Sequence, residues 1–117
     1  MTLTELVNEA HSLAIRKGWW DAQKTPRTTC DRRLALAALP EKLCLIHSEV
    51  SEALECYRNG TADSFEGKPV GIASELADVV IRVADLCGAL GIDLESVVEA
   101  KHAYNKTRPQ RHGGKLV

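Results

Sequence analysis

Apolar residues recur along this chain at intervals of three and four, and this spacing constrains the fold more than any other feature. An α-helix places such residues on one face, whereas a β-strand needs strict alternation of apolar and polar residues. The valines and isoleucines, which strands usually favour, follow the helical spacing too. Hydrophobic residues make up 44% of the 117-residue chain, enough to form one packed core. The sequence therefore predicts a single all-α domain over residues 1–117.

Local start and stop signals divide this domain into four main helices. The expected helical spans are residues 3–17, a short piece at 31–39, then 40–58, 72–89 and a last helix ending near 107. Thr2 and Glu5 suit a capping box, Pro40 suits the first turn of a helix, and Asp93 suits an N-cap. We expect a four-helix bundle in which some helices pack with a partner chain. The basic tail at about 108–117 is expected to be flexible.

Charge and apolar run length exclude several classes of protein. The net charge of −1 gives no bulk electrostatic reason to bind a nucleic-acid polymer or a membrane surface. The apolar runs are far shorter than the roughly 20 residues of a membrane span. The amphipathic, glutamate-containing N-terminus is unlike a signal peptide, and the four cysteines form no CxxC pair. We therefore expect a cytoplasmic protein without a membrane or nucleic-acid partner.

Two pairs of acidic residues occupy matching positions on neighbouring predicted helices. Glu49 and Glu52 fall about 300° and about 240° around the helix from the first residue of its apolar stripe. Glu75 and Asp78 have the same offsets on the next helix, whereas Glu55 falls opposite its stripe, as a surface charge would. The two stripes are Ile46, Val50, Ala53, Leu54 and Tyr57, and Ile72, Leu76, Val79, Val83 and Leu86.

Antiparallel packing of these two helices brings the four carboxylates together. Converging, partly buried carboxylates are unstable unless they are protonated or neutralised by a cation. Ligands that are all oxygen select a hard divalent ion, Mg²⁺ or Mn²⁺. An isolated ExxE on a helix is more often a solvated acidic face, but two matched pairs favour a metal site. The candidate metal ligands are Glu49, Glu52, Glu75 and Asp78.

The last predicted helix carries a stripe that is apolar at its start and polar or cationic at its end. The stripe consists of Leu94, Val97, Val98, Lys101, Asn105 and Arg108. This change predicts a helix that leaves the core to line an anionic pocket, where lysine and arginine hold phosphate oxygens. The asparagine can bind a phosphate or a sugar hydroxyl. The alternative is that the basic residues only complement the negative end of the helix dipole.

Several sequence segments contain these acidic and basic residues, and their order along the chain resembles that of a known protein family. They are "SEVSEALE", "SELADVVIRVADLCGALGIDLE" and "KHAYNKTR", with "KGWWD" at 17–21 and "RPQRHGGK" near the end. Together they resemble the MazG-like, all-α nucleoside triphosphate pyrophosphatases, and in particular phage and bacterial members. That superfamily is marked by ExxE, a spacer and ExxD. The resemblance covers most of the chain, although residues 22–40 carry no matching motif.

The resemblance implies Mg²⁺-dependent hydrolysis of a nucleoside triphosphate to the monophosphate and pyrophosphate, for nucleotide-pool house-cleaning. It implies a homodimer or homotetramer with sites near subunit interfaces. It also implies metal binding and catalysis by the four carboxylates listed above, with Glu52 as one candidate for orienting the attacking water.

The resemblance implies substrate contacts as well. Lys101 and Asn105 match the family's substrate-binding end of the last helix, and Arg108 is a further candidate. Lys101 is expected to stabilise charge on the phosphates during catalysis. Trp19 or Trp20 is expected to stack on the base. The alternative for the tryptophans is that one packs in the core and the other covers an interface.

Two other functions compete with this interpretation. A ferritin-like di-iron bundle needs Glu-x-x-His on two helices, but only Glu99 and His102 have that spacing. A non-enzymatic helical interaction protein would explain the helices and the tryptophans. Such an interaction protein would not explain why two acidic pairs occupy matching positions on neighbouring helices.

Overall fold

The computed structural model describes residues 1–20 and 32–109, and within these residues the protein is an all-α fold. The helices are α1 (Leu3–Arg16), α2 (Arg32–Asn59), α3 (Ile72–Leu90) and α4 (Leu94–Lys106). An isolated β-bridge between Ser64 and Val70 closes the loop that joins α2 to α3. None of the described helices combines the length and hydropathy needed to cross a bilayer. The all-α prediction is confirmed, and the tail at 110–117 lies outside the described residues.

Capping interactions explain where three of the helices begin or end. The Thr2 hydroxyl accepts from the Glu5 backbone N–H at 3.0 Å, and the Thr2 N–H donates to the Glu5 carboxylate at 2.8 Å. This reciprocal pair is the predicted capping box. Asp93 caps α4 by accepting from the Ser96 N–H at 3.2 Å. Gly91 ends α3 with φ of 69°, a left-handed conformation that favours glycine.

The predicted helix boundary at Pro40 is wrong, because α2 continues through Pro40 without interruption. A proline inside a helix lacks the N–H that would bond the carbonyl four residues earlier. That residue, Leu36, is exposed, so water can reach this side of the helix. Ala35 and Ala53 are buried on either side of Pro40. Packing along the length of α2 therefore offsets the local cost of the proline.

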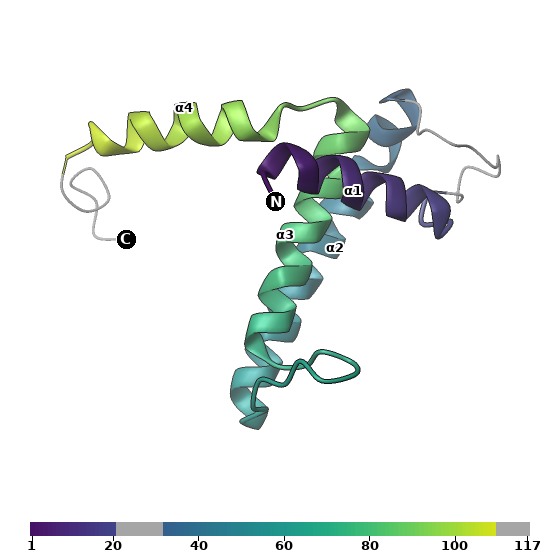
Figure 1. Ribbon diagram of the computed structural model, residues 1–117, viewed down its shortest axis with the longest axis vertical. Helices are drawn as coiled ribbons and strands as arrows, with labels where there is room; N and C mark the ends of the chain where they lie inside the picture. Colours follow the sequence, from purple (N-terminus) through teal and green to yellow (C-terminus); the bar gives the residue numbers. More distant parts are fainter. Residues whose placement is uncertain (21–31, 110–117) are drawn as a thin grey trace.

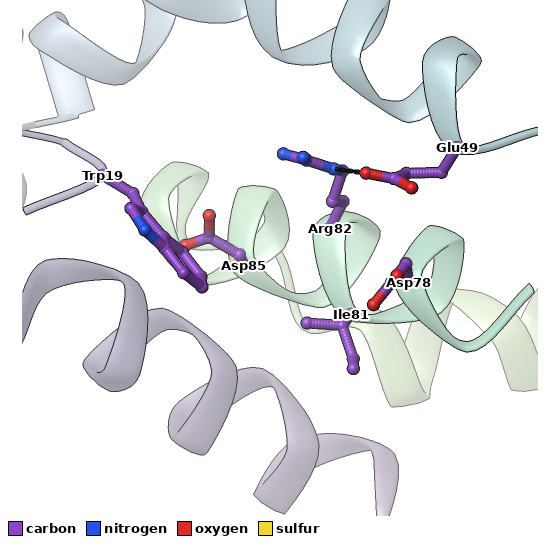
Figure 2. Close-up of a pocket in the computed structure, with 6 residues that line it drawn as sticks. All are labelled: Trp19, Glu49, Asp78, Ile81, Arg82 and Asp85. Atoms are coloured by element: carbon purple, nitrogen blue, oxygen red, sulfur yellow. Dashed lines mark hydrogen bonds and ion pairs between the residues drawn. The ribbon is translucent and has the colours of Figure 1, made fainter. Parts of the chain in front are cut away.

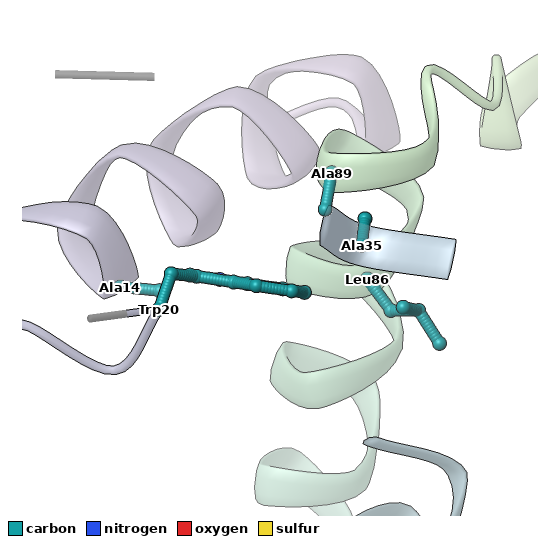
Figure 3. Close-up of a cluster of buried hydrophobic side chains, with 5 residues drawn as sticks. All are labelled: Ala14, Trp20, Ala35, Leu86 and Ala89. Carbon is teal, nitrogen blue, oxygen red and sulfur yellow. The ribbon is translucent and has the colours of Figure 1, made fainter. Parts of the chain in front are cut away.

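The helices α2 and α3 lie side by side and antiparallel, and α1 crosses the C-terminal half of α3 (Figure 1). One core cluster, shown in Figure 3, consists of Ala14, Trp20, Ala35, Leu86 and Ala89. A second cluster consists of Val7, Ala10, Ala84 and Cys87. The crossing of α1 and α3 is close, since a Cβ at Gly88 would lie 2.6 Å from the Cβ of His11.

The predicted apolar stripes are only partly used inside this chain. Ile46 and Val83 pack against the core clusters, but Val50, Leu54 and Tyr57 on α2 are each more than half exposed. The helix α4 has no buried residue and extends away from α2 and α3 (Figure 1). The described chain therefore leaves apolar surface on three helices that its own helices do not cover.

Candidate functional site

A group of three carboxylates lies where α2 passes α3. One oxygen each from Glu49 on α2 and from Glu75 and Asp78 on α3 lie within 4.8 Å of one another. Glu75 and Asp78 are one turn apart on one face of α3, and the antiparallel packing brings Glu49 opposite them. The structure thus brings together three of the four predicted ligands. Metal binding by this acidic group stays a prediction.

The fourth predicted ligand, Glu52, lies at the edge of this group. Its side chain is exposed on α2, one turn beyond Glu49. The pKa of Glu75 is raised, first because burial withdraws its carboxylate from water and then because of the neighbouring Asp78. Glu49 and Glu52 raise the same pKa further. Burial and the neighbouring carboxylates therefore both disfavour the ionised form of Glu75.

Arg82 is a functional candidate that the sequence reasoning missed. Its Nε donates to Oε1 of Glu49 at 2.7 Å, and the Glu49 side chain is only 14% exposed. Figure 2 shows the terminal guanidinium nitrogens pointing away from Glu49. The signal was present, since Arg82 follows Asp78 by four residues and so shares its face of α3. Arg82 places a positive charge beside the acidic group and keeps donors available.

The acidic group opens into a pocket of about 240 Å³. The lining residues, drawn in Figure 2, are Trp19, Glu49, Asp78, Ile81, Arg82 and Asp85. Asp78 and Asp85 are seven residues apart on α3, which corresponds to about 10 Å along the helix axis. The pocket therefore has an acidic end at Glu49 and Asp78 and an aromatic end at Trp19 and Asp85.

The two tryptophans have different environments. The Trp20 ring is 6% exposed and belongs to the core, and the ammonium of Lys42 lies 4.1 Å from its centroid. Trp19 is 56% exposed and lines the pocket. Burial of Trp20 removes it as a surface for stacking, so Trp19 is the candidate that remains for a contact with a base.

Asp85 is a second pocket residue that was not predicted. Trp20 Nε1 donates to its Oδ1 at 2.9 Å, and His11 Nδ1 lies 2.8 Å from the same oxygen. These partners come from α1 and from the residues that follow it, so the contact depends on how α1 crosses α3. Asp85 lies seven residues after Asp78, on the same face, which is the signal that the sequence offered.

The predicted substrate residues on α4 do not line the pocket of their own chain. Lys101, Asn105 and Arg108 are all exposed, and α4 extends away from the α2–α3 pair (Figure 1). The Lys101 ammonium lies 5.1 Å from the centroid of the Tyr104 ring. Glu99 and His102 are exposed on the same helix and join no potential metal-binding group among residues 1–20 and 32–109. The substrate roles on α4 stay predictions.

Comparison with known proteins finds no match among family profiles, curated proteins or solved structures. The likeness to MazG-like enzymes therefore depends on the sequence motifs.

Proposed function

We propose that the protein is a Mg²⁺-dependent nucleoside triphosphate pyrophosphohydrolase that converts a (d)NTP and water into a (d)NMP and pyrophosphate, in nucleotide-pool house-cleaning. The observation that carries the proposal is the group formed by Glu49, Glu75 and Asp78 at one end of a pocket that also contains Arg82 and Trp19. Carboxylates, a guanidinium and an exposed aromatic ring are the groups that a metal-bound triphosphate and its base require.

The donor set suits a hard divalent cation. The three side chains offer only carboxylate oxygens, which Mg²⁺ and Mn²⁺ prefer over softer ligands. Burial and then the neighbouring carboxylates raise the pKa of Glu75, so its ionised form is disfavoured, and a cation bound between the carboxylates would favour that form. Bound Mg²⁺ supplies charge neutralisation for the triphosphate and for the charge that develops during hydrolysis.

The remaining side chains of the site have separate roles in the proposed reaction. Arg82 offers guanidinium donors to phosphate oxygens beside the acidic group. Glu52 is exposed one turn from Glu49, where its carboxylate can orient a water for in-line attack at the α or β phosphorus. Trp19 offers its exposed ring to the base at the other end of the pocket.

Assembly as a homodimer or homotetramer is part of the proposal. Val50, Leu54 and Tyr57 on α2 and Leu76 on α3 are each more than half exposed. Pairing this α2–α3 hairpin with that of a second copy would bury these side chains and complete a four-helix bundle. In such an assembly α4 can carry Lys101 toward the pocket of a neighbouring copy.

The same exposed apolar surface also favours a second candidate, a non-enzymatic helical interaction protein. An interaction protein needs surfaces for its partner, but this function does not explain why three carboxylates lie within 4.8 Å of one another. Nucleotide turnover separates the two candidates.

The experiment that tests the proposal is a screen of canonical and modified nucleotides for Mg²⁺-dependent pyrophosphate release. Glu49→Gln and Asp78→Asn are each expected to abolish release without changing the mass of the oligomer in light scattering. Glu55→Gln is the matched control, because Glu55 lies on the same helix, is exposed and pairs with Arg58 at 3.1 Å. The control should retain full activity.

Two outcomes would count against the proposal. Release at the wild-type rate by both Glu49→Gln and Asp78→Asn would show that the acidic group is not the catalytic site. A complete lack of turnover with every nucleotide would overturn the enzymatic function and leave the interaction protein.

A further inference from the structure

Asp85 presents a fixed hydrogen-bond acceptor to the pocket. Its side chain is 14% exposed and lines the pocket at the end where Trp19 lies. Trp20 Nε1 can only donate, and it lies 2.9 Å from Oδ1 and 3.3 Å from Oδ2 of Asp85. His11, itself 15% exposed, approaches Oδ1 from α1. These two partners hold the carboxylate in one orientation.

The carboxylate oxygens of Asp85 can accept further hydrogen bonds from a ligand in the pocket. A carboxylate has about four lone-pair positions, and the two neighbouring nitrogens, Trp20 Nε1 and His11 Nδ1, both lie close to Oδ1. Figure 2 shows one Asp85 oxygen directed into the space between Trp19 and Arg82. An ionised carboxylate accepts hydrogen bonds and donates none, so a ligand atom at this position must carry a hydrogen.

The position of Asp85 along α3 identifies the part of a nucleotide that it can meet. The acidic group lies about 10 Å further along the helix axis, seven residues away. A nucleotide whose phosphates lie beside Glu49 and Asp78 extends its sugar and base toward Trp19. With the base stacked on Trp19, its edge faces outward from the stack, and Asp85 lines the same end of the pocket.

We propose that Asp85 selects the nucleobase by accepting a hydrogen bond from an exocyclic amino group. Cytosine, adenine and guanine carry such a group, whereas uracil and thymine present carbonyl oxygens on either side of a single ring N–H. Uracil and thymine can donate to Asp85 only through this ring N–H, which brings a carbonyl oxygen on either side of it toward the carboxylate. A carbonyl oxygen facing the Asp85 carboxylate would leave two acceptors opposed and without a proton between them. The protein therefore prefers amino-bearing bases over uracil and thymine. This inference rests on the proposed nucleotide pyrophosphatase function.

The test compares substrates that differ at one exocyclic position and the adjacent ring nitrogen. The pairs are dCTP against dUTP and dATP against dITP, each measured as kcat/KM for pyrophosphate release. Wild-type protein is expected to prefer the amino-bearing member of each pair by about tenfold or more. Asp85→Asn adds an amide donor that can pair with a carbonyl, so both ratios are expected to fall to about one or to invert.

A ratio between two substrates is insensitive to partial unfolding, because loss of folded protein lowers both rates equally. Glu55→Gln serves again as the control and should keep the wild-type ratios. Equal turnover of dCTP and dUTP by wild-type protein would overturn the role of Asp85 and leave the pyrophosphatase proposal standing. If Asp85→Asn kept the wild-type kcat/KM ratios, the role of Asp85 would likewise be overturned and the pyrophosphatase proposal would stand. Absence of turnover with every nucleotide would overturn the pyrophosphatase proposal and this inference with it.

Discussion

Replacing Glu75 by glutamine is expected to stabilise the metal-free protein and to remove its response to Mg²⁺. The carboxylates of Glu49, Glu75 and Asp78 have oxygens within 4.8 Å of one another. Two unit charges at that separation repel by about 1 kcal/mol in water and by about 3.5 kcal/mol at an effective dielectric of 20. Arg82 offsets the charge of Glu49, so Asp78 is the neighbour that matters most.

The repulsion is expected in the lower part of the range from about 1 to about 3.5 kcal/mol, because the acidic group is partly exposed to solvent. Removal of the Glu75 charge should therefore raise the free energy of unfolding by about 1–2 kcal/mol at pH 8. For a domain of this size that corresponds to a rise in Tm of about 4–8 °C.

The pH dependence of this effect follows from the raised pKa of Glu75. A carboxyl group whose pKa is higher in the folded than in the unfolded state stabilises the fold below its ordinary value of 4.5. That contribution is lost as the pH rises through the raised pKa. The advantage of Glu75→Gln over wild-type protein should therefore be present at pH 8 and disappear near pH 4.

Thermal unfolding followed by circular dichroism, in EDTA and in Mg²⁺, measures both effects. At a Mg²⁺ concentration of 100 times Kd, binding stabilises wild-type protein by about 2.7 kcal/mol. Glu75→Gln should show little of this shift, whereas the control Glu55→Gln should match wild-type protein in both buffers. A Glu75→Gln protein that is less stable than wild-type protein in EDTA at pH 8, or whose Tm rises as much with Mg²⁺, would show that Glu75 is neither repelled by its neighbours nor a metal ligand.

Three further substitutions test the packing and the charges around the site. Gly88→Ala should cost about 1–3 kcal/mol in urea unfolding, because its Cβ would lie 2.6 Å from that of His11, and a neutral result would contradict the close crossing of α1 and α3. Pro40→Ala restores a helical N–H inside α2 and should stabilise the protein by about 1–3 kcal/mol, whereas destabilisation would argue against a continuous helix. Arg82→Gln removes the charge that pairs with Glu49, so the rise in Tm caused by Mg²⁺ should increase, and an unchanged rise would place Arg82 outside the site.

Helix positions and the acidic group were largely predictable from the sequence because both depend on local spacing. The Thr2 and Glu5 capping box and the Asp93 cap are interactions within a few residues, so the chain itself encodes them. Glu75 and Asp78 share a face of α3 for the same reason. The prediction of a helix boundary at Pro40 was wrong, because the packing of α2 against α3 outweighs the cost of the backbone hydrogen bond that proline cannot make.

The exposure of the apolar stripe on α2 and the contacts of Asp85 could not be predicted from the sequence. A helical wheel shows which way each side chain points from its own helix, but not which other element it contacts. Val50, Ala53 and Leu54 were all assigned to the apolar stripe that faces the core, yet only Ala53 is buried, whereas Val50 and Leu54 are each more than half exposed. The hydrogen bond from Trp20 to Asp85 joins residues 65 positions apart and depends on how α1 crosses α3. Such contacts are fixed by tertiary packing, for which the spacing of residues in one helix carries no information.

We propose that the acidic group on α2 and α3 supports cleavage of a nucleoside triphosphate to a monophosphate. Phosphorus-31 NMR of a reaction containing the protein, a (d)NTP and Mg²⁺ distinguishes this cleavage from other reactions, because it identifies every phosphorus-containing product. We expect equal amounts of (d)NMP and pyrophosphate from wild-type protein and unchanged triphosphate from Glu75→Gln. Formation of a nucleoside diphosphate and inorganic phosphate, or unchanged triphosphate with wild-type protein across the nucleotide panel, would show that the protein is not a pyrophosphohydrolase.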